Sequence, residues 1–211
     1  WCWGANAHGQ LGIGSVAQVG EVVLSPTRVA PDLRWKNVSA AVSKTCAVTE
    51  DHIGYCWGRV PGDGSEGPEP SPVQVAGATE WRYLKATSGA CGMALDGQGY
   101  CWSWPTVTDQ GPVGDGVEYA SGETAMTPQP LAGGRSWEAF GWFATAGHCG
   151  VDSSGDVLCW GITNRIRPCV LKSFEPISVL APESECPPPP PADRKSTRLN
   201  SSHQIISYAV F

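Results

Sequence analysis

Six of the nine cysteines in the sequence fall into three pairs with the same spacing, and a tryptophan follows the second cysteine each time. The pairs are Cys46 and Cys56, Cys91 and Cys101, and Cys149 and Cys159. Cysteines in such a pattern can form disulfides, bind a metal or supply a nucleophile. The residues around them decide which chemistry is expected.

A β-hairpin accounts for the spacing of each pair. Each pair brackets a polar turn, at 50–51, 96–97 and 154–155, between short runs of strand-forming residues. Asp-Gly, as at 96–97, is a strong hairpin marker. The offset of 10 places both cysteines on one sheet face and symmetrically about the turn. We therefore predict disulfides 46–56, 91–101 and 149–159, each contributing roughly 2 to 3 kcal/mol in a chain-entropy model.

Metal binding and catalysis fit the pattern less well. The sequence has no C-x-x-C pair and no Cys/His set at zinc spacing, so no metal or other cofactor is predicted. His148 adjoins Cys149 in the manner of an activated nucleophile, but the periodic position of Cys149 favours a bridge. We predict no catalytic residue and no enzyme activity for this segment.

Persistent disulfides imply an oxidising compartment, so the predicted localisation is extracellular or in the secretory-pathway lumen. Among the other cysteines, Cys2 is expected to have lost an upstream partner, and for Cys169 and Cys186 a bridge with each other is one option that the sequence leaves open. Asn37 begins an Asn-Val-Ser sequon and is a predicted glycosylation site.

The elements that position these cysteines form a repeat. Cys-Trp recurs at positions 2, 56, 101 and 159, so one repeat spans about 50 residues, in the range of propeller blades. Ser/Thr-Pro, an aliphatic residue, Ala and Trp recur at matching offsets. Strands are predicted at 35–42, 81–86 and 137–143, and the Pro-rich stretches as loops. The recurring tryptophans are expected to form a core between blades: Trp35, Trp57, Trp81, Trp102, Trp137 and Trp160.

Composition agrees with an all-β fold, because 26 Gly, 18 Pro and 10 Trp in 211 residues favour short strands and tight turns. The sequence has 14 Lys and Arg against 20 Asp and Glu, and the basic residues do not cluster in a patch. Nucleic acid is therefore not a predicted partner. No apolar run approaches the ~18 residues of a membrane helix, and we expect no membrane contact by this segment.

Three parts follow along the chain. Residues 1–165 are the predicted partial propeller, which starts inside a repeat and is expected to be a fragment. Residues 166–192 form an irregular segment with a proline run at 187–191, a polyproline spacer. Residues 193–211 resemble a translated sequencing-library adapter, an artefact expected to be disordered and excluded from fold reasoning. Without this tail, 11 basic residues face 19 acidic ones.

The stretch Trp3 to Gly12 (WGANAHGQLG) resembles the W-G-x-N-x-x-G-Q-L-G signature of the regulator of chromosome condensation repeat family. The matching positions are Gly4, Asn6, Gly9, Gln10, Leu11 and Gly12, followed by Pro-x-x-Val at 26–29. The resemblance implies a ring of about seven blades, of which this chain supplies about three, with the missing blades of the same chain as neighbours. The later repeats lack the full signature, so their loops are expected to be shorter or differently shaped.

The cysteines make the chain similar to the propellers in ectodomains of Crinkly-type receptor kinases and in secreted proteins. This similarity implies an extracellular binding module for a protein or glycan of unknown identity. Recognition is expected in the loops 60–72 and 106–127, which are long and differ between repeats. Two alternatives are a guanine-nucleotide exchange factor or other intracellular regulator, and a polysaccharide hydrolase or lyase built on a propeller.

Overall fold

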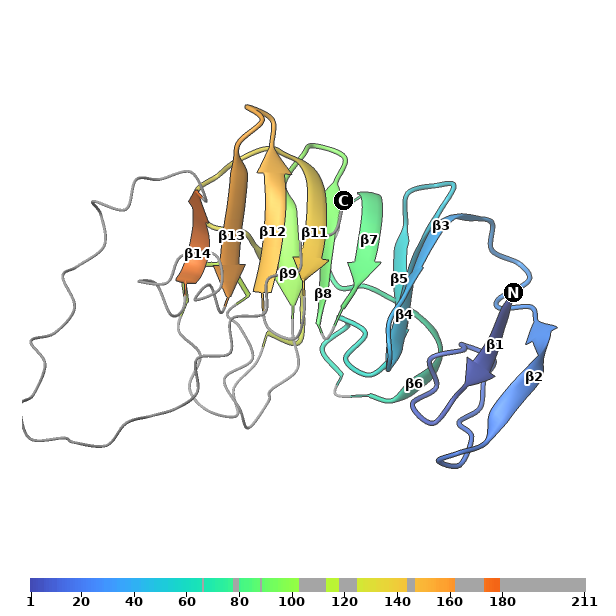
Figure 1. Ribbon diagram of the computed structural model, residues 1–211. Helices are drawn as coiled ribbons and strands as arrows, with labels where there is room; N and C mark the ends of the chain where they lie inside the picture. The colour runs from blue at the N-terminus through green and yellow to red at the C-terminus, as the bar shows by residue number, and fades with distance from the viewer. Residues whose placement is uncertain are drawn as a thin grey trace, which may run out of the picture.

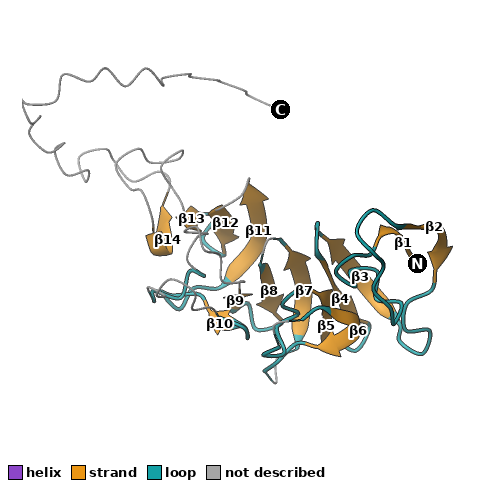
Figure 2. Ribbon diagram, turned by 90° about the horizontal axis from the view of Figure 1, so that it is seen from below, coloured by secondary structure: helices purple, strands orange, loops and turns teal. Residues whose placement is uncertain are grey.

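The computed structural model describes residues 1–65, 67–77, 80–87, 89–102, 113–117, 125–143, 147–161 and 173–178. Within these ranges every regular element is a β-strand, and the strands form four separate antiparallel sheets that follow one another along the chain (Figures 1 and 2). The predicted all-β architecture of a partial propeller is confirmed.

We number the sheets as blades 1 to 4 in chain order. Blade 1 has two strands, β1 (Cys2–Ala5) and β2 (Val22–Thr27). The other blades have four strands each, paired in sequence order. Blade 2 contains β3 (Trp35–Ala40), β4 (Lys44–Thr49), β5 (Gly54–Gly58) and β6 (Glu69–Gln74). Blade 3 contains β7 (Trp81–Ala86), β8 (Ala90–Ala94), β9 (Gly99–Trp102) and β10 (Gln129–Pro130). Blade 4 contains β11 (Trp137–Phe143), β12 (Gly147–Asp152), β13 (Val157–Gly161) and β14 (Ser173–Ser178).

Blade 1 is the second half of a blade, as its register shows. Cys2 faces Thr27 and Gly4 faces Val23. The last two strands of blades 2 and 4 pair in the same way. In each, a cysteine and the glycine two positions after it face two residues that are four positions apart on the partner strand, and the register shifts between the two pairs. The matching pairs are Cys56 with Val73, Gly58 with Glu69, Cys159 with Ile177, and Gly161 with Ser173.

Two expectations about the Pro-rich segments are wrong. The segments around Pro26 and Pro72 were expected to be loops, yet they lie inside β2 and β6. Both strands are at the edge of their sheet, where a proline without an N–H is tolerated. A third difference concerns the C-terminal boundary of the propeller. This boundary is predicted at residue 165, with an irregular segment after it, but β14 at Ser173–Ser178 belongs to blade 4.

The core lies between successive blades and is built from tryptophans. Five of the six predicted core tryptophans are no more than 2% exposed: Trp57, Trp81, Trp102, Trp137 and Trp160. Trp35 is only half-buried. The second strands β4 and β8 are buried along their whole length, so each sheet is covered on both faces there.

Candidate interaction surface

The structure contains the three disulfides expected from the hairpin spacing. In each of blades 2 to 4 the two cysteines lie directly opposite each other on the two middle strands. Their Cα atoms are 4.0 to 4.1 Å apart in the pairs 46–56, 91–101 and 149–159. Such bridges favour an oxidising environment. Among the described residues Cys2 has no disulfide partner, and Cys169 and Cys186 lie outside these residues.

His148 and Cys149 are not arranged as a base and a nucleophile. Cys149 is bridged to Cys159. The imidazole of His148 stacks on Trp160, with ring centroids 5.7 Å apart, and its Nδ1 lies 3.7 Å from Cys91 Sγ of the preceding blade. Desolvation lowers the pKa of His148 to about 4, so the ring is neutral at neutral pH.

The signature asparagine organises the loop that joins β1 and β2. Asn6 is buried, its Oδ1 accepts from the Leu11 backbone N–H at 3.0 Å, and its Nδ2 donates to the Ser15 carbonyl at 2.7 Å. The Asn6 carbonyl also accepts from Gly9 and Ala17. One side chain thus fixes a long connection in a single conformation.

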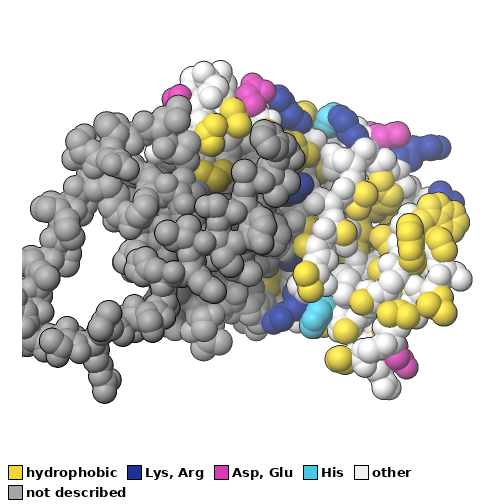
Figure 3. Space-filling model, in the orientation of Figure 1, with side chains coloured by type: hydrophobic (Ala, Val, Ile, Leu, Met, Phe, Trp, Pro, Cys, Tyr) yellow, Lys and Arg dark blue, Asp and Glu magenta, His cyan; other side chains and the backbone are white. Residues whose placement is uncertain are grey.

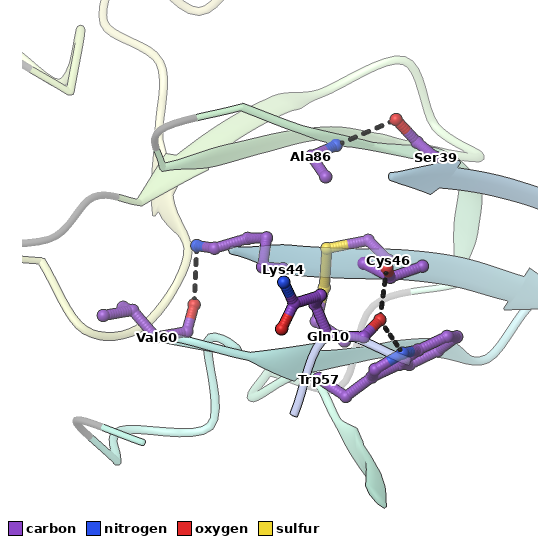
Figure 4. Close-up of a disulfide and its surroundings, with 9 residues drawn as sticks. Gln10, Ser39, Lys44, Cys46, Trp57, Val60 and Ala86 are labelled. Atoms are coloured by element: carbon purple, nitrogen blue, oxygen red, sulfur yellow. Dashed lines mark hydrogen bonds between the residues drawn. A yellow bond between two sulfur atoms is a disulfide. The ribbon is translucent and has the colours of Figure 1, made fainter. Parts of the chain in front are cut away.

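The same loop clamps blade 1 onto blade 2 (Figure 4). The Gln10 carbonyl accepts from Trp57 Nε1 at 2.9 Å and from Thr45 Oγ1 at 2.8 Å, and Gln10 Nε2 donates to the Val42 carbonyl at 3.1 Å. Gly12 lies flat on the Trp57 indole, where an added Cβ would be 2.7 Å from Nε1. The signature residues Gln10 and Gly12 therefore hold blade 1 against blade 2.

The later loops keep the glycine contact and lose the rest of the signature. A Cβ on Gly62 would be 2.6 Å from Trp102 Nε1, and one on Gly114 would be 2.6 Å from Trp160 Nε1. Between Gly58 and Gly62 the loop is shorter than between Gly4 and Gly12, as expected for that repeat. Sequence comparison missed these equivalences, although Gly-Asp-Gly at 62–64 and 114–116 parallels Gly-Ile-Gly at 12–14.

A buried lysine occupies the junction between blades 2 and 3 and was not anticipated. Lys44 is fully buried, and its Nζ donates to the Val60 carbonyl at 2.8 Å (Figure 4). Desolvation, with a smaller contribution from Arg59, lowers the pKa of Lys44 to about 7. Trp102 Nε1, which corresponds to the Trp57 donor, has no hydrogen-bond partner among the residues that the structure describes.

The connections divide between two faces of the blades. Tight turns of four residues, at 50–53, 95–98 and 153–156, join the bridged strands on one face. The loops 6–21 and 59–68, which follow Cys-Trp in blades 1 and 2, lie on the opposite face, at the lower side of Figure 1. Residues 113–117 of blade 3 belong to the same face, because Gly114 contacts Trp160 as Gly12 contacts Trp57. The predicted recognition segment 60–72 ends inside β6, and most of the predicted segment 106–127 lies outside the described residues. We call these two sides the turn face and the loop face.

The structure also bears on the predicted glycosylation site, on metal binding and on membrane-spanning helices. Asn37 lies in β3 and is exposed only in part; its Nδ2 donates to the Arg82 carbonyl at 3.4 Å, so a glycan would have to displace this contact. In the part of the chain that the structure describes, no cluster of three or more His, Cys, Asp or Glu could hold a metal ion. The described ranges also contain no helix of the length and apolarity needed to cross a bilayer.

The repeated four-stranded sheets with their glycine-tryptophan junctions define the chain as part of a β-propeller. Residues 1–48 match the family model described as the regulator of chromosome condensation (RCC1) repeat. The chain thus carries this repeat within a partial propeller, and its three disulfides fit a cysteine-rich variety.

Solved structures show the same fold. Human WBSCR16 is 16% identical with a TM-score of 0.63, and the match covers 85% of this chain and 48% of that one. Prp20p from Saccharomyces cerevisiae, whose structure is described together with its binding to Gsp1p and histones, is 20% identical with a TM-score of 0.64, and the match covers 84% of this chain and 46% of that one. Yeast RCC1 (Prp20) bound to Kap60 is 16% identical with a TM-score of 0.64, covering 84% and 43%. The chain spans about half the length of these structures. Comparison with curated proteins gives no significant match.

Proposed function

We propose that the chain is part of an extracellular or lumenal binding module whose loop face holds a protein ligand. The observation that carries this proposal is the contrast between the two faces of a disulfide-linked propeller. The bridged hairpins keep turns of one length, whereas the loops on the other face differ widely. Variable loops on a rigid scaffold are where recognition usually lies.

Charge narrows the class of ligand. The sequence between β9 and β10, residues 103–128, contains Asp109, Asp115, Glu118 and Glu123 and has neither Lys nor Arg. A segment with this excess of negative charge attracts a partner of opposite charge and disfavours an acidic one. A basic protein segment is therefore the expected ligand, and the binding of Prp20p to Gsp1p, histones and Kap60 is a precedent for protein binding by this fold.

The compartment follows from the cysteines. Three bridges within hairpins survive in an oxidising environment and are rare where glutathione keeps thiols reduced. The exchange-factor and polysaccharide-cleaving alternatives gain no support from the described residues. Alkylation of the natively expressed protein before and after reduction, with the labelled positions mapped by mass spectrometry, tests the compartment. The six cysteines of the pairs 46–56, 91–101 and 149–159 should be labelled only after reduction. Labelling of these six without reduction would refute the proposal.

The ligand is tested by crosslinking from matched positions on the two faces. Val117 on the loop face and Leu95 on the turn face are both exposed apolar side chains, at 50% and 38%. Each is replaced in turn by a photoreactive phenylalanine in the natively expressed protein. We expect protease-sensitive adducts from position 117 and not from position 95. Equal adducts from both positions, or adducts removed only by glycosidases, would contradict a protein ligand on the loop face.

A further inference from the structure

Lys44 is buried at the loop-face end of β4, with none of its surface exposed. Other basic side chains, such as Lys36 and Lys85, are exposed, and Figure 3 shows several Lys and Arg side chains at the surface. Among the described residues, Nζ of Lys44 donates to one acceptor, the Val60 carbonyl. A buried ammonium group with a single neutral acceptor is unfavourable unless a counter-charge lies beside it.

The surroundings of Lys44 do not supply that counter-charge. The strands β3, β5 and β7 pack against β4, and their ionisable side chains are Lys36, Tyr55, Arg82, Tyr83 and Lys85. The adjoining segments 6–21 and 59–65 contribute His8, Glu21, Arg59 and Asp63. None of these described carboxylates forms an ion pair with Lys44. Arg59 acts on it with a like charge, which further favours the neutral amine.

The loop that covers Lys44 is strained at the residue that contacts it. Val60 is buried and has a φ of 46°, in a region that β-branched residues rarely adopt. The corresponding Gln10 has no positive φ, and its carbonyl accepts from Trp57 Nε1. The Val60 carbonyl is directed to Lys44 instead, and no described residue accepts from Trp102 Nε1. Opening of this loop would relieve the strain and give the buried indole N–H access to water.

We propose that segment 59–65 is a pH-controlled latch, which is closed over the junction of blades 2 and 3 while Lys44 is neutral and opens when Lys44 is protonated. The closed form is the one in Figure 4, where the Val60 carbonyl covers Nζ. In the open form the ammonium group reaches water. Because the segment belongs to the loop face, control of ligand binding by this latch rests on the proposed function, and a partner of the closed form would be released as the pH falls.

The direction of the switch follows from the two protonation equilibria. Burial lowers the pKa of Lys44 from 10.5 to about 7 in the closed form, and contact with water restores the ordinary value in the open form. Between these values the open form binds more protons, so the ratio of open to closed molecules rises as the pH falls. The rise ends below pH 7, where both forms are protonated. Between pH 8 and pH 6 the ratio should increase about tenfold.

Hydrogen exchange of the whole chain measures this opening without a ligand. The Ala76 N–H donates to the Gly62 carbonyl at 2.9 Å and reports on the segment. The Ala132 N–H donates to the Gly114 carbonyl at 2.8 Å in the next junction, where Gly89 corresponds to Lys44, and is the matched control. After correction for the intrinsic exchange rates, the protection factor of Ala76 should be about tenfold lower at pH 6 than at pH 8, and that of Ala132 should not change.

The variant Lys44→Met carries no charge at either pH, so the protection of Ala76 in it should not depend on pH. A tenfold change that persists in this variant would overturn the proposal. Equal pH dependence at Ala76 and Ala132 in the unaltered chain would also overturn it, and that comparison requires no variant to fold. Neither result alters the crosslinking test of the loop face, so failure of the latch and failure of the binding role are separate outcomes.

Discussion

The two junctions on either side of blade 2 share a glycine-tryptophan contact but differ in the hydrogen bonds of the buried groups around it. In both, a loop glycine lies on a buried indole, Gly12 on Trp57 and Gly62 on Trp102. In the first junction the Gln10 carbonyl accepts from the indole N–H of Trp57. In the second, the Val60 carbonyl accepts from Lys44, and no described residue accepts from Trp102 Nε1. The glycine contact therefore defines the junction, and the polar network around it can change.

The largest expected effect comes from filling the space that the glycines leave. Gly12→Ala and Gly62→Ala should each lower the free energy of unfolding by about 2 to 4 kcal/mol, because the Cβ meets the indole and the residue has a positive φ. Gly14→Ala is the matched control, with positive φ but its nearest contact at 3.8 Å, and should cost only about 1 to 2 kcal/mol. Urea unfolding measures all three. Equal costs for Gly12→Ala and Gly14→Ala would show that the contact is unimportant.

The buried lysine should make the second junction sensitive to pH. Folding lowers the pKa of Lys44 from 10.5 to about 7, so between these values the unfolded chain binds more protons than the folded one. The free energy of unfolding should therefore rise with pH in this window, by about 1.4 kcal/mol per pH unit at most. Urea unfolding at pH 7.5 and 8.5 measures the slope. Lys44→Met should flatten it, and an unchanged slope in this variant would assign the titration elsewhere.

The smallest effect isolates the indole hydrogen bond. Trp57→Phe and Trp102→Phe remove similar buried surface, but within the described ranges Trp57 Nε1 donates to a carbonyl and Trp102 Nε1 does not. Trp57→Phe should cost about 1 kcal/mol more than Trp102→Phe, the usual net contribution of a hydrogen bond. Parallel thermal unfolding of both variants gives the difference. A larger cost for Trp102→Phe would place an unseen partner on its Nε1.

Local patterns predicted the parts of this fold that depend on neighbours in sequence. The hairpins, the pairing of Cys46 with Cys56 and the period of the tryptophans all follow from short-range spacing. The strands through Pro26 and Pro72 could not be recognised in this way, because a proline is tolerated there only once the strand lies at a sheet edge. The burial of Lys44 depends on the loop of the same blade folding over it, which no local pattern encodes.

The candidate surface was predictable only as a set of loops. Their unequal lengths are visible in the sequence, but that they share one face follows from the blades having the same strand order. The equivalence of Gly12 and Gly62 was hidden because the residues between Gly58 and Gly62 are too few to align with the signature.

Every disulfide in blades 2 to 4 closes within its own hairpin, across ten positions of sequence. Covalent links therefore never cross from one blade to the next among these pairs. During synthesis each cysteine meets its mate before the following repeat has emerged, so oxidation can proceed in step with the growing chain. Copying or deleting a repeat would carry its bridge along intact, which lets such an array change length without scrambling its cysteines.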